Sequence, residues 1–179
     1  VYLVLTGRKQ IKDHVAIEAG SAIALADFLV SPDTQAAFVT DITQIDTAVP
    51  GQYAVTLKAG RKEYTATLTV ADTVAPTAEA VPVTIFSGDE LSAADCVTDI
   101  SDVTAVTAAF ESEPDLVSAG EKTATVILTD MGGNQTKIST TITVLTDTTA
   151  PVIEGAKDIE AFVGDTISYK ADVTVTDDY

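Results

Sequence analysis

Two stretches of the chain alternate apolar residues with polar or small ones, and a glycine-containing turn interrupts each stretch. In the first, the alternating positions are Tyr53, Val55 and Leu57 before Ala59-Gly60, then Tyr64, Ala66, Leu68 and Val70. In the second, they are Ala124, Val126 and Leu128 before Gly132-Gly133-Asn134, then Ile138, Thr140, Ile142 and Val144. A period of two on both sides of a turn predicts a β-hairpin in each stretch.

The chain also repeats itself at longer range. VADTVAPTAEAV at 70–81 returns, 75 positions later, as LTDTTAPVIEGA at 145–156. A second shared pattern has a glycine, an apolar residue three positions on, then an aspartate followed by an apolar residue. Its members are Gly20, Ile23, Asp27 and Phe28; Gly88, Leu91, Asp95 and Cys96; and Gly164, Ile167, Asp172 and Val173. We therefore predict three units, 1–71, 72–146 and 147–179, of which the third is the incomplete first part of a unit.

Units of this length with six or seven short strands are typical of a two-sheet β-sandwich, with a closed barrel or a solenoid as alternatives. The 28 Thr residues support an all-β fold, because Val and Thr suit pleated, half-buried strands. SAIALADFL has helical spacing, but its length favours a strand or a single helical turn. Ala75-Pro76 and Ala150-Pro151 predict short, fairly stiff junctions, because proline restricts itself and the residue before it.

The net charge of −17 makes some partners improbable. Such a surface repels phosphate backbones and anionic lipids, so we expect no nucleic-acid partner and no membrane insertion. We expect no signal peptide within these residues, and none of their apolar stretches is long enough to span a bilayer. It starts at VYLVLT and ends at VTVTDDY, which we interpret as a piece of a longer protein.

Several phrases resemble the bacterial immunoglobulin-like (Big/HYR-like) repeats of cell-surface proteins. They are D-T-x-A-P, V-G-D, V-T-V-T-D, P-G-x-Y-x-V-T-L, L-T-D-x-G-G-N and T-I-T-V. The resemblance implies tandem immunoglobulin-like β-sandwiches on the surface or cell wall of a bacterium, and it offers no catalytic residues to carry over. The first unit departs from the pattern, because GRKEY replaces the turn motif and the TAP opening is absent.

Candidate site residues are few, and for each a structural role is expected. His14 is the only histidine and lies near the start of a predicted strand, so we expect a surface residue. Cys96 is the only cysteine, which excludes an internal disulfide, and no basic neighbour lowers its pKa, so we expect buried apolar packing. Asn134 heads a formal glycosylation sequon, but we expect a turn residue. With no other asparagine present, an intramolecular Lys–Asn isopeptide bond is not expected either.

Acidic residues could in principle bind calcium or support glycoside hydrolysis. The closely spaced pairs are Asp99 with Asp102, Asp89 with Glu90, and Asp177 with Asp178, whereas Asp72 and Asp147 each stand alone at a junction. The chain has no EF-hand run, CxxC, HExxH or GxSxG motif, and no phosphate-binding glycine loop. The sequence therefore predicts no catalytic, cofactor-binding or metal-binding residue, no cofactor and no enzyme activity.

The leading functional hypothesis is a stalk or spacer that holds other domains of its parent chain away from a cell. The alternative is an adhesin or carbohydrate-binding or protein-binding module that uses its loops or an exposed sheet face against a host protein, matrix protein or glycan. Scarce aromatic residues speak against sugar stacking. Residues 147–179 cannot bury their apolar positions alone, so we expect strand pairing with a second chain, or else packing on the second unit.

Overall fold

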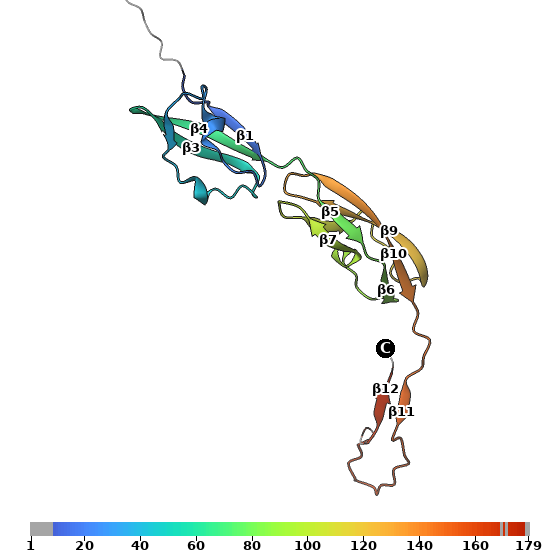
Figure 1. Ribbon diagram of the computed structural model, residues 1–179. Helices are drawn as coiled ribbons and strands as arrows, with labels where there is room; N and C mark the ends of the chain where they lie inside the picture. Colours follow the sequence, from blue (N-terminus) through green and yellow to red (C-terminus); the bar gives the residue numbers. More distant parts are fainter. Residues whose placement is uncertain (1–8, 169, 171, 178–179) are drawn as a thin grey trace, which may run out of the picture.

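The structure is a computed structural model that describes residues 9–168, 170 and 172–177. Strands dominate this described part and gather into two four-stranded and two two-stranded sheets (Figure 1). No helix among the described residues has the length and apolar character needed to cross a membrane. The predicted all-β class is confirmed.

The first unit, by which we mean the part containing β1 to β4, is a sheet of order β1-β4-β3-β2. Its strands are β1 (His14–Glu18), β2 (Ala36–Phe38), β3 (Gly51–Ala59) and β4 (Lys62–Ala71). β3 and β4 form the predicted hairpin, with Val55 opposite Ala66, whereas β1 runs parallel to β4. The stretch with helical spacing holds one helical turn, α1 (Leu25–Phe28), and a 3-10 turn, η1 (Ile42–Gln44), precedes β3.

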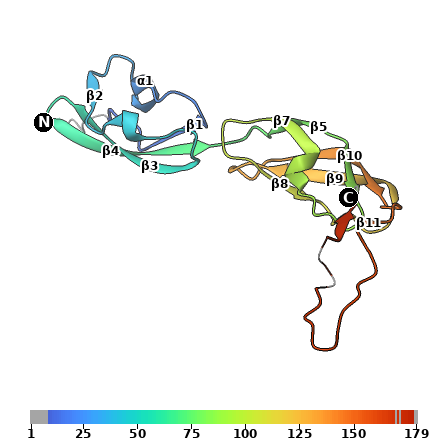
Figure 2. The same cartoon turned by 90° about the horizontal axis from the view of Figure 1, so that it is seen from below.

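The second unit, the part containing β5 to β10, has a four-stranded sheet of order β6-β10-β9-β8 and a two-stranded sheet of β5 and β7 (Figure 2). Its elements are β5 (Thr77–Ala80), β6 (Val83–Phe86), the 3-10 turn η2 (Ala93–Cys96), β7 (Val97–Ser101), β8 (Thr107–Phe110), β9 (Gly120–Thr129) and β10 (Gln135–Leu145). β9 and β10 form the second predicted hairpin, and β6 runs parallel to β10.

The two sheets of the second unit enclose one core. Val97 of β7 and Ala78 of β5 pack against Val126 of β9 and Ile142 of β10. The larger sheet has the strand order of an immunoglobulin-like sandwich, in which β8, β9 and β10 take the places of strands C, F and G. In the smaller sheet, β5 and β7 take the places of strands A and B. The fold is therefore an immunoglobulin-like β-sandwich.

The first unit has a reduced version of the second layer. A single bridge joins Ile11 to Leu29, and the Lys12 amide donates to the Phe28 carbonyl. Its core shares no residue with the core of the second unit. The boundaries at residues 71 and 146 stay a prediction.

Cys96 occupies the place in the second unit that Phe28 occupies in the first. The Val81 amide donates to the Cys96 carbonyl, just as the Lys12 amide donates to that of Phe28, and both side chains are fully buried. The expectation that Cys96 packs in the core is confirmed. Burial, to which the nearby charge of Asp95 adds, raises the pKa of its thiol.

We expect Cys96 to resist alkylation by iodoacetamide in the folded protein at pH 8. A raised pKa leaves little thiolate, and the closed core keeps the reagent out. The same protein in concentrated urea should react at the rate of an unstructured cysteine peptide. Mass spectrometry over a time course checks this, and equal rates in the two solvents would contradict the burial of the thiol.

The last part of the chain forms only a small sheet. β11 (Val152–Glu154) pairs antiparallel with β12 (Thr174–Thr176), and all residues of both strands are exposed. Ile153 and Val175 lie opposite each other and are 62% and 63% exposed, so the other described residues leave most of this pair uncovered. Packing on the second unit, the alternative named above, would bury Ile153 and Val175, whereas both are mostly exposed. Pairing with a second chain stays a prediction.

Pairing between two chains through residues 147–179 predicts that the mass in solution depends on concentration. If residues 147–179 pair between chains, the mass from light scattering should rise from that of a monomer to that of a dimer as concentration increases. Ile153→Asp should keep the protein monomeric, because a charge cannot be buried in such an interface without a large cost. A monomer at every concentration, with residues 147–179 protected from proteolysis, would refute the pairing.

Candidate functional site

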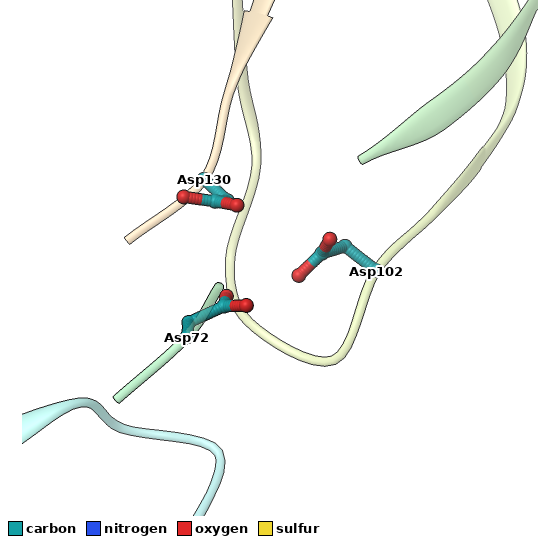
Figure 3. A group of neighbouring side chains, drawn as sticks. All are labelled: Asp72, Asp102 and Asp130. Atoms are coloured by element: carbon teal, nitrogen blue, oxygen red, sulfur yellow. The ribbon is translucent and has the colours of Figure 1, made fainter. Parts of the chain in front are cut away.

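Three aspartates meet at the end of the second unit that faces the first. Asp72, Asp102 and Asp130 each offer a carboxylate oxygen, and these oxygens lie within 4.8 Å of one another (Figure 3). Each aspartate is the first residue after a strand, because β4 ends at Ala71, β7 at Ser101 and β9 at Thr129. The strand ends therefore bring together residues that are far apart in the sequence.

Each carboxylate also shapes its own turn. Oδ1 of Asp72 accepts from the Val74 amide at 3.2 Å, and Oδ1 of Asp102 accepts from the Thr104 amide at 2.8 Å. Asp130 accepts from both the backbone and the side chain of Asn134, at 2.8 Å each. Aspartate commonly stabilises turns in this way, so the three side chains have a structural role whatever else they do.

Two neutral side chains connect the three aspartates. The Thr104 hydroxyl lies 2.7 Å from Oδ2 of Asp72 and 3.1 Å from Oδ1 of Asp102. The Asn134 side-chain amide donates to Asp130 and to the backbone carbonyl of Asp72 at 3.0 Å. Thr104 is 7% exposed, which places this network in the interior of the loop region.

The cluster carries negative charge without a basic partner. Asp72 and Asp130 are 8% and 6% exposed, and the ion pairs among the described residues join other acids to lysines. Burial would raise the pKa of Asp130, but the hydrogen bonds from Asn134, Gly133 and Gly132 outweigh it and lower that pKa. Asp130 is therefore ionised at neutral pH.

Chemically, the cluster is a set of hard oxygen donors. Ca²⁺ takes six to eight oxygens, so three aspartates could supply only part of a coordination shell. Oxygens of all three aspartates already accept hydrogen bonds within the protein. Within the described residues the cluster contains no histidine or cysteine, and the hydroxyl of Thr104 bonds to two of its carboxylates. The arrangement can hold a cation weakly or act purely as a structural network.

The structure corrects one expectation about the acids. Asp72 does not stand alone, because the fold places it beside Asp102 and Asp130. Asp99, paired with Asp102 in the sequence, lies outside the cluster in a β-bulge of β7 with φ of 51°. Asp130 and its partner Thr104 were missed by the sequence reasoning, although the LTDxGGN phrase contains Asp130.

The other acidic candidates have local roles. Asp89 accepts from the Phe86 amide at 2.9 Å, and Glu90 is exposed. Asp147 accepts from both the amide and the hydroxyl of Thr149, which also lies 3.5 Å from Asp177. Asp178 lies outside the described residues.

His14 and Asn134 are where the sequence places them. His14 is the exposed first residue of β1, and Asn134 lies in the turn between β9 and β10. Besides lying in the predicted turn, Asn134 links that turn to the segment after β4, because its side chain donates to Asp130 and to the backbone carbonyls of Asp72 and Val74. A glycan on this half-buried amide would break those bonds.

We expect Ca²⁺ to bind this protein with no submicromolar site. Three aspartates supply only part of a calcium shell, and weak attraction to their charge gives at most a shallow titration. Isothermal calorimetry of the metal-free protein tests this, with Asp102→Asn as a variant that removes one charge of the cluster. Tight binding of one ion that Asp102→Asn abolishes would contradict the prediction.

Comparisons with known proteins give weak likenesses. No family model matches the chain, and no curated protein matches it. A Rib structure from Streptococcus pyogenes is 25% identical over 38% of this chain and 90% of that chain, with a TM-score of 0.34. Human mucin-like protocadherin EC1-2 is 10% identical over 78% and 98%, with a TM-score of 0.35. Extracellular cadherin domains 1-4 of protocadherin gamma B7 are 14% identical over 80% and 52%, with a TM-score of 0.31. At these scores none of the three assigns a function, and membership of the bacterial repeat family stays a prediction.

Proposed function

We propose that this chain is a non-catalytic spacer segment of a larger secreted or surface-attached bacterial protein. Its immunoglobulin-like units succeed one another in tandem and hold other domains of the parent protein at a distance. The arrangement of the first and second units carries this proposal, because they follow each other lengthwise in both views (Figures 1 and 2).

The chemistry of the surface supports the same function. A net charge of −17 favours a soluble chain that does not adhere to other anionic surfaces. The one thiol is buried, and the acidic cluster near the junction is tied into turns by hydrogen bonds. A spacer needs these structural features and no reactive group.

Small-angle X-ray scattering of the full chain tests the proposal. A spacer should give a maximum dimension close to that of two sandwiches placed end to end, and a distance distribution with a long tail. A compact, nearly spherical particle would overturn the proposal. Measurement at low and high salt serves as a control, because repulsion within an acidic chain could extend it only at low salt.

The alternative of a binding module requires a separate test. An adhesin should bind immobilised glycans or matrix proteins in a saturable way, whereas a spacer should bind none of them at concentrations well above those used for known lectins. Saturable binding that is lost after thermal unfolding would replace the spacer proposal with the adhesin.

A further inference from the structure

Asp72, the first residue after β4, is held by the second unit. Its Oδ2 accepts from the Thr104 hydroxyl at 2.7 Å, and its backbone carbonyl accepts from the Asn134 side chain at 3.0 Å. Gly132 packs so closely on it that an added Cβ would lie 2.8 Å from the Cβ of Asp72. The chain is therefore fixed to the second unit one residue beyond the last strand of the first.

Thr73, the next residue, is held by the first unit. Its amide donates to Oε1 of Glu18 at 2.6 Å, and its hydroxyl donates to Oε2 of the same carboxylate at 3.0 Å. Glu18 ends β1, where it is paired with Ala71 of β4. The carboxylate thus ties the connecting segment back to the sheet that the segment has just left.

The attachment points alternate along the chain. Ala71 belongs to the first unit, Asp72 is bound by the second, Thr73 is bound by the first, and the carbonyl of Val74 accepts from Asn134 of the second at 3.4 Å. Consecutive Cα atoms are about 3.8 Å apart, so this crossing leaves no free residue to act as a hinge. Rotation of one unit against the other must break the Glu18–Thr73 bonds or the bonds to Asp72.

A side-chain contact between the units lies beside this crossing. Val103, between Asp102 and Thr104, reaches Gly20 of the first unit, where an added Cβ would be 2.7 Å from its Cγ1. Gly20 has a φ of 74°, a conformation that glycine adopts without strain, and it follows the end of β1 by two residues. The loop that binds Asp72 therefore also touches the first unit.

We propose that residues 71–74 form a lock that makes the first and second units one rigid body, with Glu18 as its positioning residue. The lock is independent of the spacer proposal, because a binding module could use the same fixed junction. It lies before Ala75-Pro76, and the stiffness predicted from that pair is a separate contribution that stays a prediction.

The junction after the second unit lacks both features of the lock: the carboxylate that Glu18 supplies, and an aspartate directly after the last strand. Phe86 is paired with Leu145 as Glu18 is with Ala71, so an aromatic ring stands where the lock needs a carboxylate. Asp72 directly follows Ala71, whereas Thr146 separates Asp147 from Leu145. The same chain thus contains one junction with the lock and one that cannot form it through this position.

Residual dipolar couplings from a weakly aligned sample of the full chain test the lock. Backbone amides of residues 9–71 and 75–146 each define an alignment tensor, and two parts of one rigid body share the same tensor. We expect the two tensors to coincide in the wild type. In Glu18→Ala the two tensors should diverge in magnitude and direction. Thr73→Val removes only the hydrogen bond from the Thr73 hydroxyl and keeps the one from its backbone amide to Glu18, so the tensors should diverge less.

Glu63→Ala is the matched control, because it makes the same change at an exposed position of β4. Its tensors should stay equal, and amide chemical shifts show that each unit remains folded in every variant. Unequal tensors in the wild type would overturn the lock, and so would equal tensors in Glu18→Ala. An elongated scattering profile combined with unequal wild-type tensors would leave the spacer proposal standing and remove only the lock.

Discussion

Phe28→Ala is expected to lower the free energy of unfolding of the first unit by about 3–5 kcal/mol. The ring is fully buried, and it meets Phe38 edge to face with 5.5 Å between ring centroids. Truncation removes that aromatic contact and leaves a cavity among Ile11, Val55 and Leu57, which belong to the same core. Since small domains have a total stability of about 5–15 kcal/mol, this loss is a large part of the whole.

Urea unfolding followed by tyrosine fluorescence measures this change. Tyr53 and Tyr64 pack against the core of the first unit, and the second unit contains no tyrosine. Val39→Ala is the control, because Val39 is 52% exposed and its truncation should change stability by no more than about 0.5 kcal/mol. Equal midpoints for the two variants would show that Phe28 does not anchor the core.

Gly132→Ala is expected to destabilise the second unit by about 1–3 kcal/mol. The added methyl group would overlap the backbone carbonyl oxygen of Asp72 and lie 2.9 Å from the side-chain nitrogen of Asn134. A backbone oxygen that is already hydrogen-bonded cannot move aside cheaply, so the turn and the junction must shift together. Thermal unfolding by circular dichroism and amide exchange of β9 and β10 report the loss.

Gly51→Ala separates this clash from the general effect of replacing glycine. Around Gly51 the nearest atoms lie 3.7 Å from an added Cβ, which is ordinary contact, and the change should be neutral or slightly stabilising. If Gly132→Ala is tolerated as well as Gly51→Ala, the turn between β9 and β10 does not press against Asp72 in solution.

The sequence predicted the long strands well because each carries enough alternating positions to define a face. β4 and β9 show the pattern most clearly, since Ala66, Leu68 and Val70 are buried, and so are Ala124, Val126 and Leu128. Short strands such as β2 and β11 have three residues each, too few for a period to be recognised. The place of Cys96 was predictable because the repeat aligned it with Phe28.

The acidic cluster was not predictable in the same way. Asp72, Asp102 and Asp130 lie in three different loops, and no fixed spacing connects them. Their contact depends on which strands end at the same edge of the sandwich, which follows from strand order and not from local pattern. The Glu18–Thr73 pair is equally hidden, because 55 residues separate its members.

The parallel pairing of the last strand of each unit with an early strand has a mechanical consequence. β6 lies beside β10, and β1 beside β4, with both strands of each pair pointing the same way. Tension applied at the two ends of a unit pulls such strands past each other along their length. The force is then shared among all the hydrogen bonds of the pair at once, whereas an antiparallel hairpin pulled from its open end loses them one by one. Each unit therefore resists stretching in the direction in which the chain would be pulled.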